Sequence, residues 1–140
     1  MKTFLISIAT IVALIAIFIF TPTKAPKSVE GFFQIYHQLE KPKSISDFKI
    51  LEYFNPSMGD GYHEIYFKIE KNDLVKLIKD LSLYKHPKPV KSKLKVMELF
   101  GDSFKSYSRY NPEIKETQSY PFILLFHNLE MNEVVISYNG

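Results

Sequence analysis

An uninterrupted apolar run near the N-terminus constrains this chain more than any other feature. Residues 4–20, FLISIATIVALIAIFIF, contain no charged residue, no Pro and no Gly. As a helix rising about 1.5 Å per residue, this run extends roughly 25 Å, close to the ~30 Å hydrocarbon core of a bilayer. A helix buried in a globular domain normally keeps a polar stripe, whereas here only Ser7 and Thr10 are polar. The run therefore predicts contact with a membrane through residues 4–20.

The residues after the run decide between a cleaved signal peptide and a retained anchor. A signal peptide has an apolar region of about 7–15 residues followed by a small-x-small cleavage site. Cleavage after Ala25 would place Pro26 directly beyond the scissile bond, and cleavage after Thr23 would use Thr where Ala is preferred. We therefore favour a single-pass membrane anchor over residues 1–22. Cleavage would instead give a secreted or periplasmic protein.

The flanking charges bear on the orientation of this anchor. Lys2 and the α-amine on one side nearly balance Lys24 and Lys27 on the other, so the positive-inside rule alone does not choose. The short N-terminal tail resembles the start of a signal sequence. It favours a tail in the cytoplasm and a domain on the extracytoplasmic side.

Composition excludes several classes of function. The chain of 140 residues is long enough for one domain behind the anchor. It contains no Cys, which rules out disulfides, thiolate nucleophiles, Cys-ligated zinc, iron–sulfur clusters and an acylated lipoprotein anchor. The formal net charge of +3 is too small for a nucleic-acid footprint. We expect no nucleic-acid partner and no cofactor.

Hydrophobic periodicity predicts the remaining elements. Residues 23–28 form a short Pro-containing linker, and residues 29–140 form one domain. Apolar residues at helical spacing over 29–39 follow Ser28, a plausible N-cap, and Asn72 is expected to cap a second helix. A short third helix is expected up to Phe100. Strands are predicted at residues 47–54, 62–70, 120–127 and 133–138.

These elements define an α+β fold. The order of strands and turns predicts two antiparallel hairpins, joined in one sheet, with two or three helices packed on one face. In the strand over 62–70, His63, Ile65 and Phe67 alternate with Glu64 and other polar residues. That alternation predicts one buried face and one face in water.

The candidate site residues are Asp60, His63, Glu64 and His127, brought together by the fold around a Gly-Asp-Gly turn. No pair of histidines has the short spacing that preorganises a zinc site, so no metal site is predicted from local sequence. His63 shares its face with apolar residues, which favours a hydrogen-bonded core or edge histidine over a ligand. No catalytic residue is assigned, because no Ser or Thr has a recognisable base beside it in the sequence.

Two other features have competing interpretations. The segment 85–95 holds five lysines, which are typical of a solvated surface, although contact with anionic lipid headgroups is the alternative. The nine tyrosines are typical of the rim of a small core, although aromatic residues are also enriched at protein interfaces.

These observations favour a non-enzymatic, membrane-anchored module that binds another protein or an envelope component. The first alternative is a small metal- or ligand-binding domain, or an enzyme, with a site around Asp60, His63 and His127. A second alternative is a structural subunit whose anchor packs against partner helices through Ala9, Ala13 and Ala16.

Overall fold

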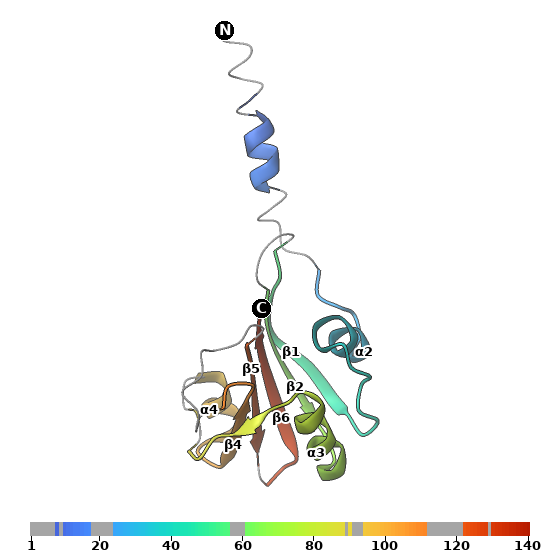
Figure 1. The fold of residues 1–140 in the computed structure, drawn as a ribbon, viewed down its shortest axis with the longest axis vertical. Coiled ribbons are helices and arrows are strands. Elements are labelled where there is room, and N and C mark those ends of the chain that lie inside the picture. Colours follow the sequence, from blue (N-terminus) through green and yellow to red (C-terminus); the bar gives the residue numbers. More distant parts are fainter. Residues whose placement is uncertain are drawn as a thin grey trace.

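The computed structural model contains a six-stranded antiparallel sheet with the strand order β1-β2-β6-β5-β4-β3 (Figure 1). The structure describes residues 8, 10–17, 24–56, 61–88, 90, 94–111, 122–128 and 130–140. The predicted α+β class is confirmed, as are the antiparallel pairs β1–β2 and β5–β6. The strands are β1 Ser46–Phe54, β2 Tyr62–Lys68, β3 Tyr84–Lys85, β4 Phe104–Ser108, β5 Phe122–Asn128 and β6 Glu133–Asn139, and the helical elements are α2 Val29–Phe32, the π-helical turn η1 Phe33–His37, α3 Lys71–Asp80 and α4 Leu94–Phe100.

The first helix begins at the predicted cap. The Ser28 hydroxyl accepts a hydrogen bond from the Gly31 N–H at 3.1 Å, which satisfies one of the free donors of the first turn. The helix widens into η1 and ends at Gln38, whose φ of 55° lies in the left-handed region. This short element places the fully buried rings of Phe32 and Phe33 against the sheet.

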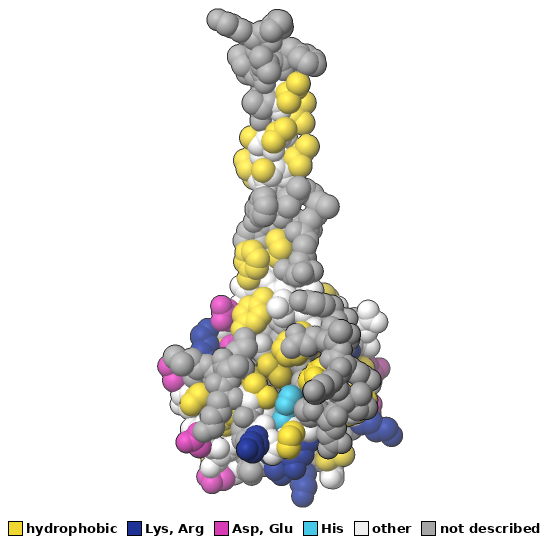
Figure 2. Space-filling model, turned by 60° about the vertical axis from the view of Figure 1, so that its left-hand side comes forward, with side chains coloured by type: hydrophobic (Ala, Val, Ile, Leu, Met, Phe, Trp, Pro, Cys, Tyr) yellow, Lys and Arg dark blue, Asp and Glu magenta, His cyan; other side chains and the backbone are white. Residues whose placement is uncertain are grey.

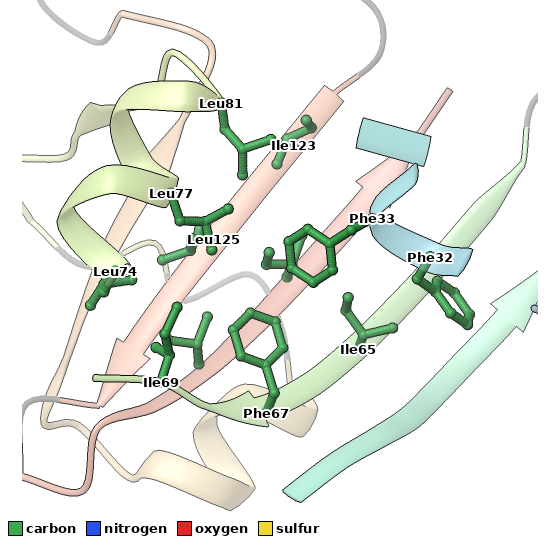
Figure 3. Packing of buried hydrophobic residues seen from close by; sticks show 12 residues of the cluster. Phe32, Phe33, Ile65, Phe67, Ile69, Leu74, Leu77, Leu81, Ile123 and Leu125 are labelled. Atoms are coloured by element: carbon green, nitrogen blue, oxygen red, sulfur yellow. The ribbon is translucent and has the colours of Figure 1, made fainter. Parts of the chain in front are cut away.

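The larger core lies between the sheet and the helices α2 and α3. Leu74 and Leu77 of α3, with Leu81 at its C-cap, recur at helical spacing and point at the same sheet face that Phe32 and Phe33 cover (Figure 3). The buried residues of this core are Phe32, Phe33, Ile65, Phe67, Ile69, Leu74, Leu77, Leu81, Ile123, Leu125, Val134 and Ile136.

The opposite face of the sheet is also covered, which corrects the prediction that all helices pack on one face. Val96 and Phe100 of α4 pack against Phe126 and Val135 in a second buried cluster. As a result β2 is buried on both faces: Glu64 is 2% exposed and Tyr66 is 8% exposed. The alternation of side chains along β2 therefore separates two buried environments, one on each face of the sheet. It does not separate a buried face from a face in water.

The start of α3 differs from the prediction. The helix begins at Lys71, with Glu70 at the N-cap position, so Asn72 lies inside the first turn. The Asp73 carboxylate accepts hydrogen bonds from the Ser44 N–H and hydroxyl at 3.0 and 2.7 Å, and the Ser44 hydroxyl accepts from the Glu70 N–H at 3.1 Å. These bonds tie the helix start to the residues that lead into β1.

The described N-terminal residues, 8 and 10–17, are helical and project away from the sheet (Figure 1). We call them the stem. Six of its apolar side chains are between 45% and 63% exposed, and Figure 2 shows apolar side chains along it. Among the described residues, no helix is both long enough and apolar enough to cross a membrane. The other positions of the predicted anchor lie outside the described residues.

Residues 24–28, the described part of the predicted linker, lie on the domain. The Tyr53 hydroxyl donates a hydrogen bond to the Lys24 carbonyl oxygen at 3.3 Å. Ala25 packs against the larger core. The chain is therefore held to the end of β1 before α2 begins.

Candidate functional site

The sheet register separates the two histidines of the candidate site. His63 pairs with Tyr138 of β6, and His127 of β5 pairs with Val134 of the same strand. Tyr138 and Val134 lie four residues apart along β6, which corresponds to about 13 Å at the rise of a β-strand. Glu64 follows His63 in β2 and so points to the opposite face. Asp60 lies outside the described residues.

His63 lies inside a group of aromatic rings. Its ring stacks on Tyr138 at 4.8 Å with an interplanar angle of 11°, and the Tyr36 and Phe32 ring centres lie at 4.5 and 5.2 Å. The side chain is 1% exposed, and its Nε2 atom is buried without a hydrogen-bond partner among the described residues. Ring packing, and not a hydrogen bond at Nε2, holds this imidazole in the core.

The turn η1 brings a second histidine, His37, against His63, with their ring centres 5.8 Å apart. Both ring nitrogens of His37 are buried and lack a hydrogen-bond partner among the described residues. Burial lowers the pKa of His37 to about 4, with a smaller effect from the Arg109 charge. Burial, and then the proximity of His37, lowers the pKa of His63 to about 3. Both imidazoles are therefore neutral at pH 7.

His37 was not among the predicted site residues. The only local signal was its place four residues after Phe33, on the apolar side of the helix pattern. The pairing itself depends on the π-helical turn and on the approach of α2 to β2, which one sequence does not reveal.

The tyrosines around this histidine pair form a hydrogen-bonded group. The Tyr36 and Tyr53 hydroxyls lie 2.9 Å apart, and the Asn55 side-chain amide donates to the Tyr36 hydroxyl at 3.2 Å. Burial, and then the Tyr53 hydroxyl, raises the pKa of Tyr36 well above its usual value. Tyr36 therefore stays protonated at neutral pH.

On the opposite face, Glu64 lies between β1 and β6. It pairs with Glu52 on one side and with Ser137 on the other. The Lys95 ammonium lies 3.0 Å from the Glu52 carboxylate. The hydrogen bond to Glu52, with a further contribution from the charge of Glu64, raises the pKa of Lys95. This arrangement ties α4 to the β1 side of the sheet.

One serine does have a histidine beside it, a pair that no sequence motif indicates. The His86 Nε2 lies 2.7 Å from the Ser108 hydroxyl oxygen. The Ser108 hydroxyl donates its proton to the Tyr110 carbonyl oxygen at 2.8 Å. Because a hydroxyl has one proton, His86 must act as the donor to Ser108. The histidine does not accept the serine proton, so this geometry lacks the activated nucleophile of a hydrolase.

The lysine-rich segment has mixed surroundings. Lys95 forms an ion pair with Glu52, whereas Lys85 and Lys88 are exposed.

In the ranges that the structure describes, no group of three or more His, Asp or Glu side chains is arranged to hold a metal ion. Comparison of the chain with protein-family models, with characterised proteins and with solved structures finds no match.

Proposed function

We propose that this chain is a single-pass membrane protein, anchored through residues 4–20, whose domain binds another protein at the extracytoplasmic surface. The partner is another envelope protein. The role of the domain is recognition, not catalysis, and the proposal needs no cofactor.

The observation that carries the anchor is the exposure of the stem. Its side chains Ile11, Val12, Leu14 and Ile17 are 56–63% exposed and point in different directions around the helix, with Ala13 and Ala16 between them, so apolar surface surrounds the helix. None of them belongs to either buried core. Apolar surface left in water costs about 25 cal/mol per Å², and a bilayer removes that cost. A helix that is apolar on every side is typical of a membrane span.

A recognition role is supported by the outer edge of β1. This strand of nine residues ends the sheet on one side, whereas the opposite edge strand, β3, has only two. An edge strand offers unpaired backbone donors and acceptors to an extended segment of a partner. Ile50, midway along β1, is 41% exposed. The edge therefore offers backbone groups together with an apolar contact.

The described histidines and serines support recognition over catalysis. His37 and His63 are buried among aromatic rings, and the Ser108 hydroxyl donates its hydrogen bond to the Tyr110 carbonyl oxygen. The separation of His63 from His127 weakens the alternative of a site assembled around them. We do not propose that alternative.

Co-purification tests the recognition role. We expect a near-stoichiometric partner, resident in the extracytoplasmic envelope, when the tagged full-length chain is purified from its native membrane in mild detergent and analysed by mass spectrometry. The substitution Ile50→Lys is expected to abolish this association, because a lysine on an edge strand opposes strand addition.

The matched control is Val75→Lys, which changes another exposed aliphatic residue, 61% exposed and located on α3. It is expected to keep the partner. A chain that purifies alone, or an equal loss of partner in both variants, would argue against recognition through β1. A partner confined to the cytoplasm would contradict the proposed orientation.

A further inference from the structure

The ends nearest the stem of four neighbouring strands, β1, β2, β6 and β5, carry aromatic side chains on both faces of the sheet. In the last paired row, Phe54, Tyr62, Asn139 and Phe122 lie side by side across β1, β2, β6 and β5. In the next row the residues are Tyr53, His63, Tyr138 and Ile123. Neither row contains a residue that is charged at neutral pH, given the lowered pKa of His63. We call Tyr53, Phe54, Tyr62, Phe122 and Tyr138 the aromatic end.

The other end of the same strands is charged. Ser46 pairs with Lys68, and Lys68 pairs with Glu133. The Lys68 ammonium also lies 2.8 Å from the Asp47 carboxylate. The sheet is thus polarised along its strands, with aromatic rings at one end and ionised groups at the other.

The aromatic end faces the stem. The C-terminus, which follows β6, lies at the end of the domain from which the stem projects (Figure 1). The hydrogen bond from Tyr53 to the Lys24 carbonyl fixes the incoming chain to this same end. Figure 2 shows apolar side chains on the stem and on the adjoining part of the domain.

Only a few residues connect this end of the domain to the apolar run. From Phe20 to Lys24 there are four peptide steps, which span at most about 14 Å when fully extended. The headgroup region on each side of a bilayer is roughly 5–8 Å thick. The aromatic end therefore lies within or immediately above the headgroups once residues 4–20 span the membrane.

We propose that the aromatic end rests on the lipid headgroups and fixes the orientation of the domain on the membrane. This inference depends on the proposed anchor. Tyr and other amphipathic aromatic rings favour the membrane interface, where one edge is apolar and the other is wet. Phe54, which is 49% exposed, supplies the apolar contact. Lys24, whose carbonyl oxygen is bonded to Tyr53, and Lys27 further along the chain are both exposed, and their charges suit the negative surface of anionic lipids.

Tryptophan fluorescence tests this placement, because the chain contains no Trp and each variant has a single indole. The full-length Phe54→Trp variant is inserted into phosphatidylcholine vesicles whose acyl chains carry bromine, a quencher, close to the glycerol backbone. We expect it to lose more than about half of its emission relative to unbrominated vesicles, as for an indole at headgroup level. The matched control is Met131→Trp in the turn at the charged end, where Met131 is 57% exposed. Its emission is expected to stay unchanged.

The outcomes separate the two proposals. If the protein floats with the vesicles but neither variant is quenched, or both are quenched alike, the aromatic end does not rest on the membrane although the anchor stands. If the protein does not float with the vesicles, the anchor itself is wrong and this inference falls with it.

Discussion

At the scale of single residues, the buried pair His37 and His63 makes the stability of the folded state depend on pH. Three of their ring nitrogens are buried without a hydrogen-bond partner among the described residues. Protonation would place a charge among aromatic rings and close to the Arg109 charge that already lowers the pKa of His37. The folded state therefore holds both histidines in the neutral form, whereas the unfolded chain leaves them free to protonate.

This pair predicts loss of stability in acid. Each folded pKa, about 4 for His37 and about 3 for His63, lies below the usual value of 6.5. The contribution to stability is thus fully present above pH 6.5 and is lost as the pH falls toward the folded values. Between pH 7 and pH 5 each histidine should remove about 2 kcal/mol from the unfolding free energy. Urea denaturation of the full-length chain in detergent micelles measures this loss.

The double variant His37→Phe and His63→Phe is the informative comparison. Phe keeps an aromatic ring but cannot titrate, so the acid-dependent loss over this pH interval should become small. An unchanged pH dependence in the double variant would show that other groups are responsible.

At the scale of elements, α4 decides how many layers the fold has. The sheet has α2 and α3 on one face and α4 on the other, so the fold has three layers. The neighbouring residues Leu99 and Phe100 show this directly. Phe100 is 6% exposed, whereas Leu99 is 48% exposed.

Substitution of these two neighbours tests the position of α4. Phe100→Ala should lower the unfolding free energy by about 3 kcal/mol, because it leaves a cavity between α4 and the sheet. Leu99→Ala should change it by less than about 0.5 kcal/mol, since it removes an exposed side chain. Chemical denaturation of both variants provides the measurement. Equal effects would contradict the packing of α4 on the second face.

The sequence predicted those elements whose signals are local. The Ser28 cap and the hairpin β1–β2 depend on residues close together in the chain, and the structure confirms both. The strand β4 was not predicted, because Ser106 and Ser108 are small polar residues that do not suggest an interior. They are 1% exposed, and hydrogen bonds with the Val90 N–H and the Tyr110 carbonyl satisfy them.

The site was less predictable than the fold. His63 was singled out by its place in β2, but the contact with His37 depends on how α2 packs over the sheet. Likewise, the burial of Glu64 depends on the second face being covered by α4, which β2 alone does not reveal. Contacts between distant elements follow from packing, and a single sequence has no periodicity that reports them.

At the scale of the whole molecule, the apolar, aromatic and charged parts follow one another in a single order. An exposed apolar stem precedes an aromatic end of the sheet, and the charged end lies furthest from the stem. This order matches the change from hydrocarbon through headgroups to water across a membrane surface. The proposed anchor accounts for the stem and places the aromatic end at the interface, which leaves the edge of β1 available to a partner.

The central claim is that residues 4–20 hold the chain in a membrane. The most direct measurement is alkaline carbonate extraction of native membranes, followed by the intact mass of the protein in each fraction. The account predicts that the protein stays in the membrane pellet with a mass that includes residues 1–25. Recovery in the soluble fraction, whether at full mass or without the first 23 or 25 residues expected from cleavage, would contradict it.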